Sequence, residues 1–314
     1  MAETESNWQI VYRNAPLWYH SVHDPRGKGA ARNQRVNSIT RVDVFDPSWL
    51  TIADNPALAE KRDFPAWLYY EVVVGRQRYL YLFFEVYHPI DDKGYPFGLG
   101  SHPQDLEWVC QVYDREQSKV VAAVTLFHDT WYWGYRKDAG VLPRSNILTM
   151  RPLHIDGPTQ RPTIHIQDGG HGIRLFDPKK PREPWLIYVP HTTMADIPAD
   201  IPWFTKGGIT PWKTVRYRLV NMSQLGGLLA HRDDLNVFRS TNRQQRLAAR
   251  VDGKIVASPA TPVWCTGLAT GLVRTRVAGV DRWLSPIVIN PNKIVVQAFK
   301  GIAREAIAEN PFLV

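Results

Sequence analysis

Two runs of aromatic and β-branched residues give the clearest hydrophobic pattern along the chain, at residues 66–74 and 77–88. Gly75 and Arg76 lie between them, and a short link of this kind is typical of a β-hairpin. Residues 79–87 are apolar on both faces, which favours a central strand that is covered on both sides. The pattern therefore predicts a hairpin in the middle of a β-sheet.

Shorter alternating patterns predict further strands, and Gly, Pro and Asp fill the connections between them. These strands are expected at residues 38–45, 105–114, 119–128, 163–167 and 185–189, and a short strand that enters a loop at residues 9–20. Helical spacing appears later, in an Arg-rich segment at 233–249 and an amphipathic one at 293–309. We expect a mainly β domain over residues 1–205 and a mixed α/β extension over residues 206–314, either separate or packed on the same domain.

The composition is that of a folded, β-rich protein. Aromatic residues make up 11% of the chain, with twelve Trp and thirteen Tyr, and such side chains pack well on a sheet. The net charge of +8 is compatible with an anionic partner. However, the basic residues are scattered and no nucleic-acid-binding motif accompanies them, so we do not expect a nucleic-acid partner.

Cysteine usage and the absence of targeting signals suggest an intracellular setting. Cys110 and Cys265 are too few for a disulfide framework, and Cys110 lies in an apolar run that predicts a buried thiol. The N-terminus does not resemble a signal peptide, and no apolar stretch reaches the roughly 18 residues of a membrane span. We therefore expect a cytoplasmic protein, or one exported without a signal peptide.

The segment with the clearest chemistry follows the aromatic strand. Alternation puts Asp105 and Glu107 on one face of a strand, about 7 Å apart. The other face, with Leu106, Trp108, Cys110 and Val112, is a core face by composition. His102 precedes them in an expected loop that would let it fold back. One imidazole with several carboxylate oxygens suits a divalent cation such as Mg²⁺, Ca²⁺ or Mn²⁺. Asp91 and Asp92 are further candidate ligands, and the alternative is a solvent-facing acidic pair beside a structural histidine.

This stretch resembles the Gly-His-Arg-His-Asp-Trp-Glu heptapeptide of the necrosis-inducing-protein family, and a related signature of a vacuolar protein sorting family. The resemblance implies that His102, Asp105 and Glu107 are cation ligands, with Asp91 or Asp92 as an upstream one.

The resemblance extends in the same order over about residues 10–190, through segments 15–20, 80–88, 124–128 and 161–171. It implies an antiparallel β-sandwich with an acidic cation pocket at one end. The family's second His is Gln104 here and its Trp is Leu106, which favours a retained cation site over cytolytic activity.

Three further histidines are candidates for moving a proton, because imidazole titrates near neutral pH. They are His128 at a strand end, His165 facing away from the core of its strand, and His171 in a Gly-rich turn. The alternative for each is a structural histidine. Trp131, Trp133 and Tyr135 form a dense aromatic group, which predicts either a platform for a sugar ring or a second core cluster.

Three functions follow from these features. The first is a metal-dependent enzyme of the hydrolase or lyase type, in which the cation polarises a small-molecule substrate or activates water. The second is a protein that binds a glycan or lipid headgroup through the cation. The third is a structural protein whose ion stabilises a loop.

Overall fold

The computed structural model describes residues 6–21, 39–40, 65–74, 78–91, 102–127, 130–139, 150–167, 171–179, 185–191, 204–205, 208–209, 213–221, 248–251, 254–257, 273–277 and 280–284. Along the chain the described elements are α1 (Asn7–Asn14), β1 (Leu17–Ser21), β2 (Trp67–Val74), β3 (Tyr79–Asp91), β4 (His102–Asp114), β5 (Lys119–Phe127), β6 (Thr130–Tyr135), η2 (Lys137–Ala139), β7 (Met150–Pro152), β8 (Thr163–Ile166), β9 (Ile173–Leu175), β10 (Trp185–Pro190), β11 (Phe204–Thr205), β12 (Gly208–Ile209), β13 (Lys213–Asn221), β14 (Ala248–Val251), β15 (Lys254–Ala257), β16 (Val273–Val277) and β17 (Val280–Leu284). Among these residues, no helix is long and apolar enough to cross a membrane.

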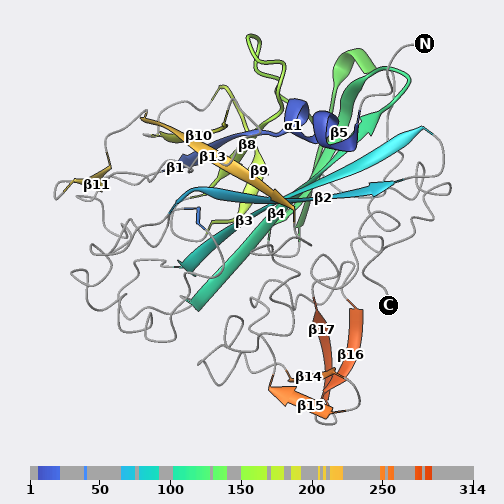
Figure 1. The fold of residues 1–314 in the computed structure, drawn as a ribbon, viewed down its shortest axis with the longest axis vertical. Helices are drawn as coiled ribbons and strands as arrows, with labels where there is room; N and C mark the ends of the chain where they lie inside the picture. Colours follow the sequence, from blue (N-terminus) through green and yellow to red (C-terminus); the bar gives the residue numbers. More distant parts are fainter. Residues whose placement is uncertain are drawn as a thin grey trace.

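Eleven strands form one sheet, in the order β7-β6-β5-β4-β3-β2-β13-β10-β1-β8-β9 (Figure 1). Neighbours are antiparallel from β2 to β6, whereas β13 runs parallel to both β2 and β10, and β1 runs parallel to β8. The mainly β class expected from the sequence is confirmed. A purely antiparallel sandwich is not confirmed, because the sheet is mixed and curls on itself until it is nearly closed.

The curl brings β9, at one edge of the sheet, against β5 and β6 near the other edge. Thr125 in β5 donates from its hydroxyl to the carbonyl oxygen of Trp108 at 2.7 Å, and the same hydroxyl lies 3.5 Å from the carbonyl oxygen of Ile173 in β9. A Cβ added at Gly134 in β6 would lie 3.1 Å from side-chain carbons of Leu153 and Leu175. The missing side chain at Gly134 therefore allows the close approach of β6 and β9.

Replacing Gly134 with alanine is expected to destabilise the protein by about 1 kcal/mol. Alanine would gain roughly 0.5–1 kcal/mol from the reduced entropy of the unfolded chain, but overpacking costs roughly 1–3 kcal/mol and outweighs that gain. Urea unfolding followed by circular dichroism measures the change. Gly157→Ala is the matched control, since nothing lies within 4 Å of a Cβ built there, and its stability should not fall. Equal midpoints for the two variants would show that the contact at Gly134 does not limit packing.

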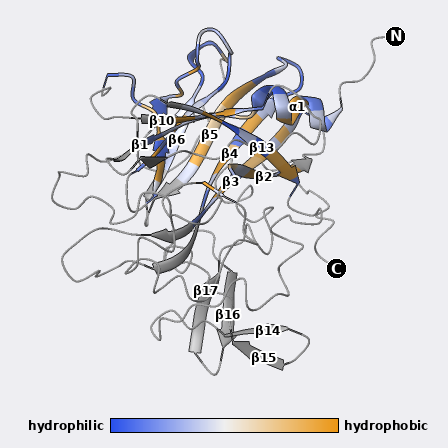
Figure 2. Ribbon diagram, turned by 60° about the vertical axis from the view of Figure 1, so that its left-hand side comes forward, coloured by the Kyte–Doolittle hydropathy of each residue, from blue (hydrophilic) through white to orange (hydrophobic). Residues whose placement is uncertain are grey.

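The interior of the curled sheet holds the main hydrophobic core, which runs along the central strands (Figure 2). On β3, Leu82, Phe84 and Val86 belong to this core, while Tyr81 and Phe83 on the opposite face are no more than 1% exposed. Both faces of β3 are therefore covered, which confirms the prediction of a central strand.

Helix α1 packs at the end of the interior where β3 begins. Ser6 is its N-cap: the Ser6 Oγ accepts from the Gln9 backbone N–H at 3.3 Å, and the Ser6 backbone N–H donates to Gln9 Oε1 at 2.8 Å. This reciprocal capping box starts a helix where the sequence suggested a strand, so that prediction was wrong for residues 9–14. The buried Ile10 and Val11 then join the core, and Arg13 donates to the Tyr113 hydroxyl at 2.7 Å.

The sheet continues beyond the expected domain boundary, because β13 lies between β2 and β10. The division at residue 205 stays a prediction. Residues 248–249, at the end of one expected helix, belong to β14, while the rest of that helix and the expected helix at 293–309 lie outside the described residues. Cys110 is fully buried as predicted, and Cys265 lies outside the described residues.

Candidate metal centre

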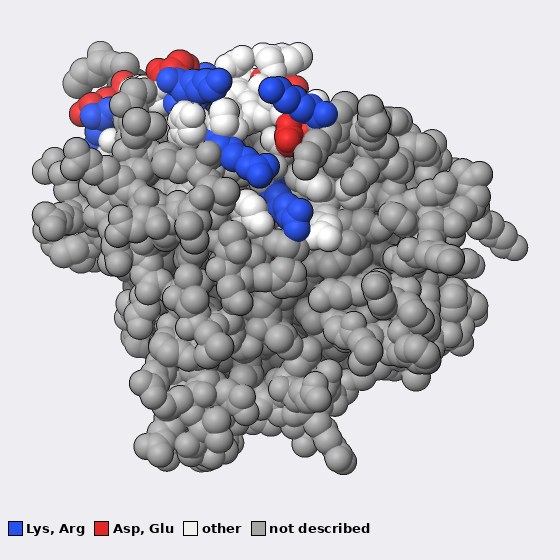
Figure 3. Space-filling model, turned by 180° about the vertical axis from the view of Figure 1, so that it is seen from behind, with Lys and Arg blue, Asp and Glu red and all other residues white. Residues whose placement is uncertain are grey.

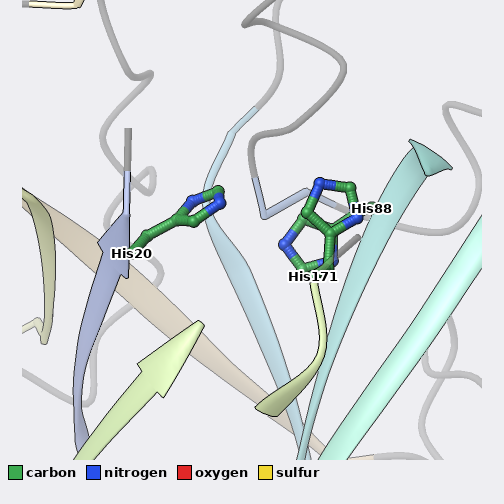
Figure 4. A group of neighbouring side chains, drawn as sticks. All are labelled: His20, His88 and His171. Atoms are coloured by element: carbon green, nitrogen blue, oxygen red, sulfur yellow. The ribbon is translucent and has the colours of Figure 1, made fainter. Parts of the chain in front are cut away.

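Three histidines from distant parts of the chain meet inside the curled sheet. His20 is in β1, His88 is in β3, and His171 is in the turn between β8 and β9. One ring nitrogen of each can be chosen so that all of them lie within 4.8 Å of one another. Figure 4 shows the His20 ring directed toward the other two, which lie one over the other. We call these residues the histidine triad.

Strand alternation places His20 and His88 on the inner face. His20 lies two residues after Trp18, and His88 two residues after Val86, and both of those neighbours belong to the core. His171 reaches the interior from a turn, where its φ of 45° lies in the left-handed region. That conformation costs a non-glycine residue about 1 kcal/mol or more, so the surrounding structure must hold it in place.

All three imidazoles are shielded from solvent: His20 is 1% exposed, and His88 and His171 are fully buried. Burial lowers the pKa of His20 well below its ordinary range, and the His171 and His165 imidazoles lower it further. Burial also lowers the pKa of His88, with additional effects of His171 and His20. His20 and His88 are therefore neutral at physiological pH, which is the protonation state that a metal ligand needs.

Within the part of the chain that the structure describes, neither ring nitrogen of His20 or His88 has a hydrogen-bond partner. Buried polar groups without partners cost free energy, and most native proteins avoid them. The rings of His88 and His171 are stacked, with centroids 3.8 Å apart and planes 5° from parallel. A bound ion would give one nitrogen of His20 and one nitrogen of His88 a partner, and the second nitrogen of each ring would still need one.

The stacking of His88 on His171 sets a condition for metal binding. Metal–nitrogen bonds of about 2.0–2.1 Å at tetrahedral angles place ligating nitrogens about 3.3 Å apart. The candidate ligand nitrogens of the triad lie within 4.8 Å of one another, a range that includes this spacing. Imidazole also ligates close to its ring plane, and two stacked rings cannot both do so at one ion. Metal binding therefore requires at least one ring of the stacked pair to rotate about its side-chain bonds.

Positions 105 and 107, which hold the acidic motif Asp105 and Glu107, lie on the same face of the sheet as His88. In the register of β3 with β4, Asp105 is the Cα partner of His88, and Glu107 is the partner of Val86. Residues directly opposite each other on neighbouring strands share a face, so positions 105 and 107 lie on the inner face. Glu107 is only 3% exposed. The opposite face, which the sequence predicted as a core face, is buried at Trp108, Cys110 and Val112, and Tyr113 on the face of Glu107 belongs to the main core as well.

The loop expected around His102 is part of β4. His102 is the Cα partner of Asp91, and the pairing is regular from there to Asp105. Positions three apart in a regular strand lie on opposite faces, so the expected backbone fold-back is absent. The side chains of His102, Asp105 and Asp91, and all of Asp92, lie outside the described part of the structure. The ligand set His102–Asp105–Glu107 with Asp91 or Asp92 stays a prediction.

The expected proton-transfer histidines are dispersed. His171 belongs to the triad. His165 is half-buried on the outer face, as its alternation with Ile164 and Ile166 predicted, and its Nε2 lies 2.9 Å from Ser21 Oγ. His128 lies outside the described residues. Proton transfer by His128, His165 or His171 stays a prediction.

The expected aromatic platform lies on β6. Trp133 is fully buried, and Tyr135 is half-buried; the Trp131 side chain lies outside the described part of the structure. A side chain with no exposed surface cannot present a ring to a sugar. Burial of Trp133 therefore favours the alternative, a second core cluster.

Sequence reasoning missed His20 and His88. The available signal was weak: each is a histidine two positions after a large apolar residue in a strand. That spacing shows that a side chain points toward the core only where the inner face of the strand is already known. For β3 it was not, because both faces of that strand are apolar.

The fold and the triad define a mainly β protein with a buried cluster of three histidines. No protein-family model matches the chain, and no curated protein matches it. Among solved structures, it is similar to the crystal structure of Necrosis and Ethylene inducing Protein 2 from the causal agent of cocoa's Witches Broom disease. The sequence identity is 13% and the TM-score 0.30, over 56% of this chain and 70% of that chain.

Proposed function

We propose that this protein binds a divalent metal ion through His20, His88 and His171. The observation that carries the proposal is the meeting of three buried imidazoles whose nitrogens lie within 4.8 Å of one another. Among the described residues, the nitrogens of two of these imidazoles, His20 and His88, lack hydrogen-bond partners. A structural role as packed aromatic residues explains the burial but leaves those nitrogens unsatisfied. A metal ion at the triad would give one nitrogen of each of these two rings a partner.

The chemistry of the ligands favours zinc or a similar transition-metal ion. Imidazole suits Zn²⁺, Cu²⁺, Ni²⁺ and Fe²⁺, whereas Mg²⁺, Ca²⁺ and Mn²⁺ prefer oxygen ligands. The oxygen-preferring ions expected from the acidic motif remain the proposal for a site built on Asp105 and Glu107. Three histidines with one open position form the ligand set of catalytic zinc sites, which agrees with a metal-dependent hydrolase or lyase.

A second candidate function is binding of a glycan or lipid headgroup through the cation. On the described part of the face in Figure 3, Lys and Arg side chains lie beside acidic ones, and these basic groups offer contacts to an anionic ligand. This candidate belongs to the cation site that the sequence predicts at His102, Asp105 and Glu107, because the imidazoles of the histidine triad are at most 1% exposed.

Zinc titration of the purified, metal-free protein tests the metal site. Equilibrium dialysis with elemental analysis should give one zinc ion per chain for the wild type. His20→Ala, His88→Ala and His171→Ala should each weaken zinc binding by at least about 100-fold, because each removes one ligand of a three-ligand set.

The matched control is His154→Gln. His154 is a half-buried histidine whose Nδ1 lies 2.7 Å from Thr163 Oγ1, and it is not part of the triad. Its variant should bind zinc as the wild type does, and circular dichroism should show the same β content in every variant. Stoichiometric zinc in a folded His88→Ala variant would refute the assignment. A loss of zinc in Glu107→Ala with normal binding in the triad variants would move the site to the acidic motif.

A further inference from the structure

A hydrogen bond between two side chains lies on the outer face of the sheet, opposite the face that carries the histidine triad. Ser21 is the last residue of β1, and its Oγ lies 2.9 Å from Nε2 of His165 in β8. The two residues are 144 positions apart in the chain, so this contact is a tertiary one. Ser21 is 4% exposed, which shields its hydroxyl from competing water.

This hydrogen bond is adjacent to one of the triad histidines in sequence. Ser21 directly follows His20, and successive side chains of a strand point to opposite faces. The parallel pairing of β1 with β8 sets His20 opposite Ile166, and Tyr19 opposite His165. Ser21 therefore cannot be a ligand of an ion at the triad, and its effect on the ion passes through the backbone of β1.

The same contact also reaches the segment that carries His171. Strand β8 ends at Ile166, and the next residue, Gln167, donates its backbone N–H to the carbonyl oxygen of Gly172 at 3.1 Å. This bond closes the turn that holds His171, whose ring lies edge-on to that of His20 with centroids 5.8 Å apart. The Ser21–His165 bond thus ties the strand of His20 to the strand that leads into the His171 turn.

Both of these ligand-bearing segments lie near strand ends. His20 is the last residue but one of β1, and His171 follows the end of β8. Strand ends open more readily than strand centres, whereas a metal site needs its ligands held within about 0.5 Å of the binding geometry. A side-chain hydrogen bond between the two ends supplies such a restraint.

We propose that Ser21 and His165 are positioning residues of the metal site, whose hydrogen bond keeps the ends of β1 and β8 together so that His20 and His171 face the same ion. This inference rests on the proposed metal site and adds the residues that hold it in shape. The ion binds only the joined arrangement. Loss of the bond therefore lowers the fraction of protein that is competent to bind, and the apparent affinity falls with that fraction.

Zinc titration of Ser21→Ala and of His165→Phe tests the inference, with equilibrium dialysis as the measurement. Phenylalanine keeps a ring of similar size but can neither donate nor accept the hydrogen bond. Each variant should still bind one zinc ion per chain, with an affinity about fivefold weaker than that of the wild type, the factor that corresponds to one hydrogen bond. The double variant should be no weaker than either single variant, because all three lack the same bond.

Thr163→Val is the matched control. It removes the hydroxyl from the other hydroxyl–imidazole contact of β8, in which Thr163 Oγ1 lies 2.7 Å from Nδ1 of His154. Thr163 is at the start of β8, opposite Leu17, and so at the other end of the paired segment from His20. The control should lose stability in urea to an extent similar to Ser21→Ala, while its zinc affinity stays that of the wild type. Positioning is thereby separated from a general loss of stability.

The results also separate this inference from the proposed function. A wild-type protein that binds no zinc would overturn both. Zinc binding that is lost in the triad variants but unchanged in Ser21→Ala and His165→Phe would leave the metal site standing and overturn the positioning role. The positioning role is also wrong if Thr163→Val weakens zinc binding as much as Ser21→Ala does, or if the loss in the double variant equals the product of the two single losses.

Discussion

Saturation with zinc should raise the free energy of unfolding by about 4 kcal/mol when free zinc is about 1,000 times its dissociation constant. The reason is that the three ligands lie at positions 20, 88 and 171, so the unfolded chain does not hold them together. The native state therefore binds the ion far more tightly. For a chain of 314 residues, an increase of that kind corresponds to a rise in the melting temperature of roughly 6 °C. Thermal unfolding with and without zinc measures it.

Variants identify the source of this stabilisation. His88→Gln should lose the zinc-dependent rise while folding normally without metal, because it removes one ligand but keeps a polar side chain of similar reach. His154→Gln should retain the full rise. If His88→Gln and the wild type respond equally to zinc, the ion stabilises the protein from another position and the triad is not its site.

Glu71→Gln should stabilise the protein at about pH 7 by on the order of 3 kcal/mol. Glu71 in β2 and Glu85 in β3 lie on the outer face of the sheet, and are 5% and 0% exposed. Both Glu85 oxygens and one Glu71 oxygen lack hydrogen-bond partners. Burial raises the pKa of Glu71 to about 8, and burial together with Glu71 raises the pKa of Glu85 well above its usual value.

The sign of the pH dependence follows from the raised pKa. The native protein keeps a proton on Glu71 that the unfolded chain releases above about pH 4.5, so stability declines from there until the native carboxyl also ionises near pH 8. Glutamine has the shape of the protonated acid and does not ionise, so the variant should lack this decline. Urea unfolding between about pH 4.5 and pH 8 measures the difference.

Glu116→Gln is the matched control, because Glu116 is 67% exposed and pairs with Arg78 only at the surface, at 3.0 Å. A surface pair of this kind contributes at most about 1 kcal/mol, so this variant should change little. If Glu71→Gln is less stable than the wild type at every pH, a bound cation or a basic group compensates the carboxylate, and the burial argument is wrong.

The sequence predicted those parts of the fold that depend on local patterns. Strands β4 and β5 were expected within three residues of their observed bounds, because alternating apolar residues and turn residues are visible along a single segment. Strand β13 was not predicted, since its place depends on β2 and β10, which lie far away in the sequence. Helix α1 was missed because the capping signal of Ser6 and Gln9 was not recognised before a short apolar run.

The candidate site was predicted only in part for a related reason. His171 and Glu107 drew attention because their local sequences are unusual, in a Gly-rich turn and in an acidic motif. His20 and His88 sit in ordinary strands, and their meeting depends on how far the sheet curls. That curl follows from packing between distant segments, such as Leu175 against Gly134, and no single segment of sequence encodes it.

The position of β13 also bears on the order of folding. This strand joins the two halves of the sheet, although it is the last strand of that sheet to be synthesised. During translation, β2 to β6 can pair as successive neighbours, but β10 and β1 cannot connect to β2 until residue 221 has left the ribosome. Long-range parallel pairing is slow to form, so completion of the interior, and with it assembly of the three histidines, is expected as a late step of folding.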